Sequence, residues 1–321
     1  MKKLIIQIPC FNEAGTLALA LKEIPRTVPG FDKVEILIID DGSTDATVEV
    51  AQKCGVEHVV KHHHNMGLAK AFMTGIHAAL AAGADVIVNT DADNQYCAAD
   101  IPLLTAPVLS GEAEYVIGTR PISEISHFSP VKKILQKIGS FMVRKFSGTQ
   151  VEDAPSGFRA LSKEAALQLN VFNDYTYTLE TIIQAGYKNM KIKCVPIRVN
   201  EDLRPSRLVK SIPKYIERSV CTMIRIAIIY RPFRFFMTCG ITSFLIGCLI
   251  GIRFLWYYFN HAGQGMMQSL LLASLFLLAG FISCIIAFVA DLLAVNRKML
   301  EDIQSILRKE CALTGQKDEI S

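Results

Sequence analysis

The sequence lacks a strong excess of charge of either sign. Its 321 residues carry a formal net charge of +4. Proteins that bind nucleic acid crowd basic residues on one face or along one helix, and a charge of this size does not indicate such a surface. We therefore expect no nucleic acid among the partners of this protein.

A cysteine framework is also missing. Nine cysteines are scattered along the chain without a CxxC pair or a regular spacing, so a disulfide scaffold and a cysteine metal site are both poorly supported and a reducing cytosol fits best. A signal peptide is not expected, because Asn12 and Glu13 interrupt the first apolar run before a signal-peptide core is complete. Residues 4–8 are better explained as a buried strand.

Charged side chains almost vanish from residues 233–293. Within this region, residues 235–252 and 269–290 are uncharged stretches of 18 and 22 residues, close to the roughly 20 residues with which a helix spans a hydrocarbon core. We therefore predict two transmembrane helices that form a hairpin. The alternative is a buried hairpin in a soluble protein, but a core helix rarely stays apolar on every face over this length.

The flanking charges predict how this hairpin is oriented. Arg231 and Arg234 precede the first stretch and Arg297 and Lys298 follow the second, whereas the connecting segment FNHAGQGMMQ (259–268) has no Lys or Arg. Arg253, directly after the first stretch, is expected to reach the outer interface by extending its side chain. Because positive residues stay on the cytoplasmic side, we expect both flanks and the amino-terminal domain in the cytoplasm. The protein is then a multi-pass protein of the inner (plasma) membrane that contacts membrane lipids.

Two further patterns in this region leave alternatives open. Gly247 and Gly251 form a GxxxG pattern that allows close approach of the partner span or of a second protomer in a homo-oligomer, or they reflect composition alone. Residues 211–230 interleave Lys214, Arg218 and Arg225 with apolar residues. This pattern is typical of an interfacial helix that contacts lipid phosphates, and equally of an amphipathic helix packed on a soluble domain.

The composition thus predicts four parts along the chain. Only the first mixes charged and apolar residues as soluble α/β proteins do. The parts are a soluble domain at residues 1–210, an amphipathic juxtamembrane helix at 211–232, two transmembrane helices at 233–293 and a cytoplasmic tail at 294–321.

The soluble domain alternates short apolar runs with helical patterns. Residues 4–9, 34–40 and 86–91 are apolar runs that end in polar residues, as buried parallel strands do. The segments between them, at 16–24, 44–53 and 68–82, show helical spacing. This alternation predicts a doubly wound α/β fold, with a mostly parallel sheet and helices on both faces. In such sheets ligands bind beyond the carboxyl ends of the strands.

The second apolar run ends in two aspartates, Asp40 and Asp41. We expect both to face outward, where a carboxylate pair suits hydrogen bonding to a ribose or a base edge. Ser43 or Thr44 is expected to cap the following helix. The alternative, an ordinary DG turn, accounts only for residues 42–45.

Polar residues also follow the first and third runs. The first run leads into Pro9, Asn12 and Glu13. The third leads into DADNQ, where Asp91 and Asp93 are able to face one hard cation. Oxygen ligands suit Mg²⁺ or Mn²⁺, and Mg²⁺ is commonly shared between protein carboxylates and substrate phosphates. A further loop, residues 65–70, enters a helix whose amino end favours an anion.

Together these motifs resemble the family 2 glycosyltransferases of the GT-A fold, and more narrowly their dolichol-phosphate-mannose-synthase and bactoprenol-phosphate glucosyltransferase branch. The resemblance covers about the first two thirds of the chain, and the two trailing apolar stretches match bacterial members of that branch. The motifs that carry it are PCFNE (9–13), DDGSTD (40–45), NMGLAKA (65–71), DADNQ (91–95), GTR (118–120) and SGFRA (156–160).

The resemblance implies roles for individual residues on the donor side. Asp91, Asp93 and Gln95 are implied to bind Mg²⁺ or Mn²⁺, which bridges the diphosphate of a nucleotide-sugar. Arg120 matches a basic residue near the phosphates. The residues implied to hold the nucleotide are Pro9, Asn12, Glu13, Asp40, Asp41, Lys70, Asp91 and Ala92.

On the acceptor side, Asp153 matches a carboxylate proposed to act near the acceptor. The branch usually has an R-x-x-G-x-S-K-like loop that closes on the substrate, whereas this chain reads LRPSRL and lacks that glycine and lysine. Tyr96 stands where a histidine often occurs and has no assigned role. The residues implied near the acceptor and its phosphate are Ser156, Arg159, Arg204, Ser206 and Arg207.

The implied reaction is inverting transfer of a sugar from a nucleotide-sugar to a polyprenyl (undecaprenyl or dolichyl) phosphate at the cytoplasmic face of the membrane. A phosphate monoester has a second pKa of ~6 and is already anionic at neutral pH, so the difficulty is to bring two anions together. Arginines then neutralise charge, and Asp153 acts as a base or orients the sugar. The arginines concerned are Arg120, Arg159, Arg204 and Arg207.

Other functions fit less well. A processive polysaccharide synthase shares the core fold but carries a QxxRW motif and more spans, whereas here Gln184 is followed by AGYK; an enzyme acting on another glycolipid is a related alternative. A non-catalytic membrane subunit that binds a nucleotide-sugar is a third, against which the intact Asp91, Asp93 and Asp153 argue. We interpret residues 62–64, three histidines, as a polar loop and not a metal cluster, because adjacent residues at a strand end point to different sides.

Overall fold

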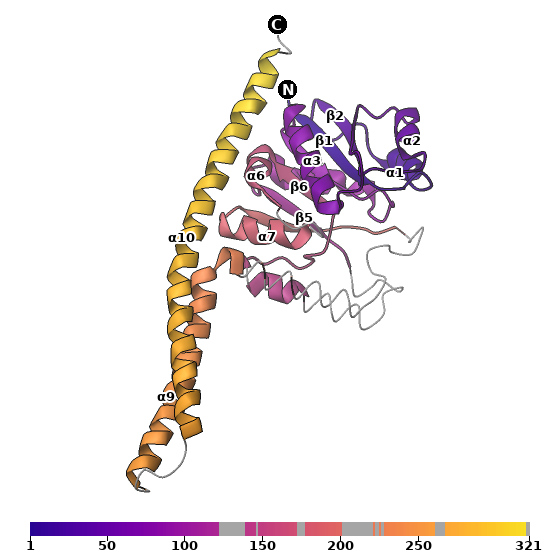
Figure 1. The fold of residues 1–321 in the computed structure, drawn as a ribbon. Helices are drawn as coiled ribbons and strands as arrows, with labels where there is room; N and C mark the ends of the chain where they lie inside the picture. Colours follow the sequence, from indigo (N-terminus) through magenta and orange to yellow (C-terminus); the bar gives the residue numbers. More distant parts are fainter. Residues whose placement is uncertain are drawn as a thin grey trace. The chain divides into compact units, whose positions relative to one another are not determined.

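The computed structural model describes most of the chain (Figure 1). The described residues are 1–121, 139–145, 147–171, 177–200, 221, 225, 228–260 and 267–318. By their backbone contacts they divide into two compact units, residues 1–219 with 303–321, and residues 220–302. Most of the predicted juxtamembrane helix at 211–232 lies outside the described residues.

The first unit is built on one seven-stranded sheet with the order β3-β2-β1-β4-β6-β5-β7. Its neighbouring strands are parallel except that β6 runs antiparallel to both β4 and β5. This arrangement confirms the predicted mostly parallel sheet. The strands are β1 (Lys3–Cys10), β2 (Lys33–Asp40), β3 (His58–Lys61), β4 (Val86–Asn89), β5 (Tyr115–Thr119), β6 (Arg159–Ser162) and β7 (Ile192–Pro196).

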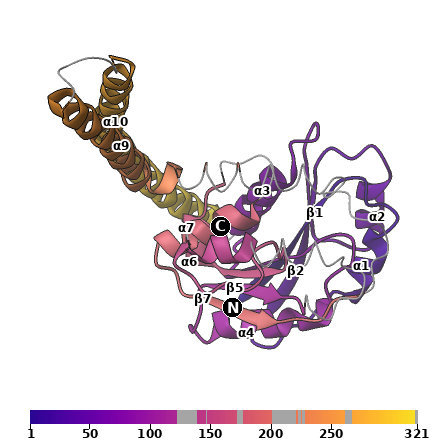
Figure 2. The ribbon, with the colours of Figure 1, turned by 90° about the horizontal axis from the view of Figure 1, so that it is seen from below.

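Helices cover both faces of this sheet, as the sequence predicts. Helix α3 packs on β1, β2 and β4, whereas α4 packs on β4, β5, β6 and β7 from the other face. Figure 2 shows α3 and α4 on opposite sides of the strands. The helices of this unit are α1 (Leu17–Glu23), α2 (Thr47–Lys53), α3 (Leu68–Ala81), η1 (Ala98–Asp100), α4 (Ile101–Leu109), α6 (Lys163–Gln168) and α7 (Thr178–Tyr187).

The pleat of β1 explains why the strand is buried on both faces from Leu4 to Cys10. Side chains alternate between the two faces, so that Leu4, Ile6 and Ile8 join the core formed with α1 and α4, while Gln7 turns to α3, where its amide lies 3.5 Å from the carbonyl of Phe72. A strand with both faces covered has no face for water.

The start of α2 differs from the expectation. Neither Ser43 nor Thr44 caps this helix, which begins at Thr47. Instead, Asp45 Oδ1 accepts a hydrogen bond from the Thr47 amide at 3.1 Å. Ser43 and Thr44 bond to Asn12 of the preceding loop, so the cap prediction was wrong because these side chains satisfy a tertiary contact.

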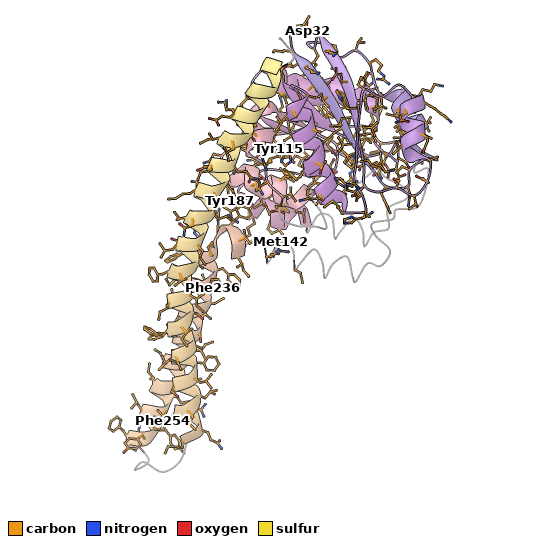
Figure 3. All side chains as sticks on the ribbon, turned by 45° about the horizontal axis from the view of Figure 1, so that its top comes forward. Asp32, Tyr115, Met142, Tyr187, Phe236 and Phe254 are labelled. Atoms are coloured by element: carbon orange, nitrogen blue, oxygen red, sulfur yellow. The ribbon has the colours of Figure 1, made fainter. Side chains whose placement is uncertain are left out.

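Two long apolar helices make up most of the second unit, and the second of them continues beyond its end at residue 302. Helix α9 (Pro232–Asn260) has 29 residues and includes the first predicted span, and α10 (Met267–Asp318) has 52 and includes the second. Both are long and apolar enough to cross a membrane, and only 11% and 17% of their most apolar windows is buried. Figure 3 shows side chains, Phe236 and Phe254 among them, standing out along this hairpin.

Glycines set the contact between α9 and α10, but not in the GxxxG spacing. A Cβ on Gly247 would lie 2.9 Å from the Leu277 amide nitrogen, and one on Gly240 would lie 2.8 Å from Cys284 Sγ. A Cβ on Gly251 would meet nothing within 4 Å. Gly247 thus approaches the partner helix as expected, and its companion is Gly240, seven residues earlier, which lies on the same face of the helix.

An ion cluster fixes the amino-terminal end of β2. The buried carboxylate of Glu35 lies 2.9 Å from Lys3 Nζ, 2.5 Å from Lys33 Nζ and 2.7 Å from His58 Nε2. Burial opposes ionisation, but hydrogen bonds from Lys33, His58 and Lys3 outweigh it and lower the pKa of Glu35 from 4.5 to about 2. The folded state therefore favours the charged carboxylate.

We expect Glu35→Gln to lower the free energy of unfolding by about 2 kcal/mol at pH 7, since part of the cluster is exposed and screened. Because the folded pKa is depressed, this stabilisation is complete above pH ~4.5 and is lost as the pH falls toward 2. Thermal unfolding of the detergent-solubilised protein at several pH values measures it. Glu49→Gln, at an exposed position on α2, serves as control, and a Glu35→Gln deficit that does not shrink below pH 4 would contradict the assignment.

Candidate active site

The predicted motifs lie at one edge of the sheet. The loops that follow β1, β2 and β4 lie there because parallel strands end at a common edge. Arg120 comes directly after β5 at the same edge. Since β6 is reversed, the residues that precede it, Ser156 to Phe158, also lie at this edge and not at the opposite one.

Asn12 joins the first loop to the second. Its backbone amide donates to Ser43 Oγ at 2.9 Å, and its side-chain oxygen accepts from the Thr44 amide at 2.8 Å. The next amide, of Glu13, donates to Thr47 Oγ1 at 2.9 Å. These contacts show that Asn12 and Glu13 shape the two loops that were predicted to hold the nucleotide.

Asp41 holds the loop between β3 and α3, which is the third loop at this edge. Its carboxylate accepts hydrogen bonds from the amides of Met66 (2.9 Å) and Gly67 (2.8 Å). It also lies 2.7 Å from His62 Nδ1, and His62 Nε2 lies 3.0 Å from Thr74 Oγ1 on α3. The prediction that Asp41 faces outward was wrong, because its oxygens satisfy backbone amides at the start of α3.

Asp40 is buried as well, but its carboxylate is differently placed. Oδ1 accepts from the Ser43 amide at 3.1 Å, whereas Oδ2 is buried without a hydrogen-bond partner in the part of the chain that the structure describes. An unmatched carboxylate oxygen is costly when buried. Of the two aspartates, Asp40 is therefore the one with an acceptor left for an N–H or O–H group of a ligand.

Gly42 makes the turn between these aspartates and the helix possible. Its φ of +73° is a conformation that residues with a side chain rarely adopt. A Cβ here would lie 2.5 Å from the backbone carbon of His64. The loop after β2 and the loop after β3 therefore pack backbone against backbone at Gly42.

DADNQ follows β4 directly and contains the two candidate metal ligands. Burial, and then the charge of Asp93, raise the pKa of Asp91 to about 7, against the opposing effect of Arg120 and Arg159. Asp93 Oδ1 accepts from the Gln95 amide at 3.2 Å. Ala92 between them is buried. The two carboxylates are thus close enough for mutual repulsion, which a cation relieves.

This donor set fits a hard divalent ion. Among the described residues no group of three or more His, Cys, Asp or Glu side chains gathers to hold a metal. Mg²⁺ is usually bound by one or two carboxylates together with water and substrate phosphates. Asp91 and Asp93 would hold Mg²⁺ or Mn²⁺ in that manner, with the remaining positions left for a diphosphate.

Arg120 and Asp153 form a buried bidentate ion pair. Arg120 Nε lies 2.7 Å from Asp153 Oδ2 and Nη2 lies 3.0 Å from Oδ1. Their side chains are 9% and 0% exposed. Both oxygens of Asp153 are engaged, so in this arrangement Asp153 orients the guanidinium, and service as a base requires that the pair separates.

Arg159, predicted to lie near the acceptor phosphate, uses its donors within the protein. Its side chain is fully buried, with Nε donating to the Ser156 carbonyl at 2.7 Å and Nη2 to the Ala154 carbonyl at 2.8 Å. Nη1 donates to Thr181 Oγ1 and to the hydroxyl of Tyr115, which Figure 3 labels inside the sheet unit. The donors are used to hold the segment before β6.

The remaining predicted residues are dispersed. Pro9 is buried within β1, and Lys70 is exposed on the first turn of α3. Ser156 is fully buried, and its hydroxyl has no hydrogen-bond partner among the described residues. Arg204, Ser206 and Arg207 lie outside the described residues.

Sequence reasoning missed two residues of this edge. His62 was interpreted as part of a polar loop, yet it is buried against Asp41, while its neighbours His63 and His64 are exposed. Tyr96 had no assigned role, yet its hydroxyl accepts a hydrogen bond from the Gly157 amide at 2.9 Å. An aromatic residue within a polar loop was the available signal for Tyr96.

The matches to known proteins cover the part of the chain that contains these motifs. The sequence model described as Glycosyl transferase family 2 matches residues 5–169. A UDP-N-acetylglucosamine–dolichyl-phosphate N-acetylglucosaminyltransferase of Methanococcus voltae is 30% identical over 222 residues, which cover 61% of this chain and 85% of that protein. An undecaprenyl-phosphate mannosyltransferase of Micrococcus luteus is 28% identical over 212 residues, 63% of this chain and 85% of that protein.

A solved structure shares the fold. Glucosyl-3-phosphoglycerate synthase of Mycobacterium tuberculosis, crystallised with Mn²⁺, uridine diphosphate and glucosyl-3-phosphoglycerate, has a TM-score of 0.55 and 19% identity. The match covers 69% of this chain and 80% of that one. It agrees with the predicted GT-A fold of the sheet unit.

The raised pKa of Asp91 predicts how metal binding depends on pH. A proton and a cation compete for this carboxylate, which is largely protonated below pH ~7, so we expect Mn²⁺ affinity to be about tenfold weaker at pH 6 than at pH 8. Titration of the full-length protein with Mn²⁺, followed by electron paramagnetic resonance of the free ion, measures it. Asp91→Asn should bind weakly at both values, and equal wild-type affinity at pH 6 and pH 8 would refute the expectation.

The two aspartates of DDGSTD are expected to differ. Asp40→Asn should weaken binding of uridine or guanosine diphosphate about tenfold with little change in melting temperature, because Oδ2 has no partner among the described residues. Asp41→Asn should lower the melting temperature, because one oxygen and one NH₂ group do not satisfy two backbone amides. Calorimetric binding and thermal unfolding of both variants separate the roles. Unchanged stability of Asp41→Asn together with lost nucleotide binding would reverse the assignment.

Proposed function

The chain belongs to glycosyl transferase family 2, and from this premise we propose that it transfers a sugar from a nucleotide-sugar to a polyprenyl phosphate. The observation that carries the proposal is the pair of carboxylates, Asp91 and Asp93, beside the unmatched oxygen of Asp40 at one edge of a GT-A sheet. The acceptor class is supported by relatives named for dolichyl and undecaprenyl phosphates.

On the donor side, Asp40 Oδ2 accepts a hydrogen bond from the nucleoside, and Asp91 and Asp93 hold the divalent ion. When bound, Mg²⁺ or Mn²⁺ supplies the positive charge that stabilises a departing diphosphate. Asn12 and Asp41 keep the surrounding loops in place through their backbone contacts. The loops are thus shaped before the donor arrives.

On the acceptor side, charge neutralisation matters more than proton removal. A polyprenyl phosphate is anionic at neutral pH, so its oxygen attacks without a strong base. Arg120, fixed by Asp153, presents a cation of defined orientation beside Asp91. We assign Asp153 the task of orienting Arg120, and in-line attack then inverts the anomeric centre. Arg204, Ser206 and Arg207 remain predicted phosphate contacts.

The two long apolar helices support a membrane location for this chemistry. In our proposal α9 and α10 both span it, because most of their apolar surface is exposed and 29 residues exceed the roughly 20 that cross the hydrocarbon core. Arg231, Arg234 and Arg297 flank the spans and keep both ends in the cytoplasm. The sheet unit then works at the cytoplasmic face, where polyprenyl phosphate is accessible.

Incubation of the full-length protein in detergent with a panel of nucleotide-sugars and either undecaprenyl or dolichyl phosphate tests this function. We expect one sugar-phospholipid by mass spectrometry, lost on chelation of divalent ions, and a fall of at least about 100-fold in Asp91→Asn and Asp93→Asn. Glu49→Gln serves as the active control. Donor hydrolysis without lipid product, or transfer that persists in both variants, would exclude the proposal.

A further inference from the structure

The carboxylate of Asp91, the first in DADNQ, lies against Gly157 in the segment that precedes β6. Strands β4 and β6 pair antiparallel with Asn89 opposite Arg159. The same register, continued two residues beyond each strand, sets Asp91 opposite Gly157. A Cβ on Gly157 would lie 3.0 Å from Asp91 Oδ2 and 3.1 Å from Oδ1, closer than nearly all real Cβ contacts. A side chain at this position would therefore push the carboxylate away by a few tenths of an ångström.

The peptide units of Gly157 are held from both sides. The amide of Gly157 donates to the Tyr96 hydroxyl at 2.9 Å, and its carbonyl accepts from Asn89 Nδ2 at 2.8 Å. Asn89 is itself fixed, since its side-chain oxygen accepts from Gln7 Nε2 at 2.9 Å and its Nδ2 lies 2.9 Å from the Tyr177 hydroxyl. All these side chains are buried, so the glycine has little freedom to move.

Stacked rings lock the two tyrosines of this network. Tyr96 stacks on Phe158, with centroids 5.2 Å apart, and Tyr177 stacks on Phe72, with centroids 3.9 Å apart and rings 2° from parallel. Tyr96 follows Asp93 by three residues, so the loop that carries both carboxylates also supplies a clamp on the glycine. The loop therefore closes on itself through Gly157.

We propose that Gly157, held in place by Tyr96 and Asn89, fixes the Asp91 carboxylate in the orientation that binds the divalent ion. We call this contact between Gly157 and Asp91 the seat. Without it, repulsion from Asp93 would turn the Asp91 side chain away, and binding would have to reverse that rotation. A side chain already fixed in its bound position loses less entropy and binds more tightly. Gly157, Tyr96 and Asn89 are positioning residues, and the inference rests on the metal site of the proposed function.

Gly157→Ala tests the seat directly. The φ angle of Gly157 lies outside the left-handed region, so alanine is compatible with the backbone and acts through its methyl group, which would lie against the Asp91 carboxylate and 3.1 Å from the Tyr177 hydroxyl. We expect Mn²⁺ binding to the protein alone to weaken about tenfold, and the Mn²⁺ concentration for half-maximal transfer to rise likewise. Gly139→Ala is the matched control, because a Cβ there meets nothing within 4 Å. Wild-type Mn²⁺ affinity in Gly157→Ala would overturn the seat.

Tyr96→Phe gives a second test that keeps the stacked ring and removes only the acceptor of the Gly157 amide. A two- to fivefold weaker Mn²⁺ affinity, roughly one hydrogen bond, at an unchanged melting temperature supports the clamp. Unchanged affinity overturns it, even if Gly157→Ala fails to fold. Asp91→Asn identifies the binding that belongs to this site. A wild-type protein that binds Mn²⁺ there without making lipid product contradicts only the proposed function, whereas one that binds none at Asp91 overturns the seat.

Discussion

The antiparallel pairing of β6 with β4 is the constraint on which the candidate site depends. In an all-parallel sheet the segment before β6 would begin at the opposite edge, far from the loops that follow β1, β2 and β4. Reversal of this one strand brings Gly157 to Asn89, 68 residues away in sequence, with a hydrogen bond of 2.8 Å. The same reversal carries Asp153 to Arg120, which follows β5. Both contacts join a segment that was predicted on the donor side to a segment that was predicted on the acceptor side.

Two buried arginines, Arg120 and Arg159, influence the charge of Asp91 at this edge of the sheet while their own donors bond to groups of the protein. Arg159 is fully buried, and its hydrogen-bond acceptors in the part described are neutral carbonyls and hydroxyls. Its charge is therefore not cancelled locally, and it opposes the rise in the pKa of Asp91. Arg120 acts in the same direction while paired with Asp153. Buried guanidinium groups thus keep a desolvated carboxylate closer to its ionised form.

The sequence was sufficient for the fold class and for the places where the loops meet, because long apolar runs and helical spacing report burial directly. Strands β1, β2 and β4 were predicted, whereas β3, β5, β6 and β7 were not; β4 has only four residues, and it was found because its apolar run leads directly into DADNQ. The outward orientation predicted for Asp40 and Asp41 was wrong, and Arg159 uses its donors within the protein, for one reason. Residue type does not reveal whether a charged group satisfies a ligand or the backbone, and only the tertiary contacts decide. Close approach of a second helix through Gly247 and Gly251 was one of two interpretations of the GxxxG pattern, and the structure shows it at Gly247 together with Gly240.

The two aspartates of DDGSTD illustrate how neighbouring identical residues divide two tasks. Successive residues at a strand end point to opposite faces, so one carboxylate turns toward α3 and the other toward the first loop. Asp41 meets two backbone amides and a histidine, and these contacts fix the start of α3 close to the ligand edge. Asp40 meets one amide and keeps a buried oxygen unmatched. A buried unmatched acceptor destabilises the folded protein, and a ligand that supplies the missing donor recovers that free energy on binding. The sequence pair DD therefore combines a residue that builds the site with a residue whose incomplete hydrogen bonding favours occupation of it.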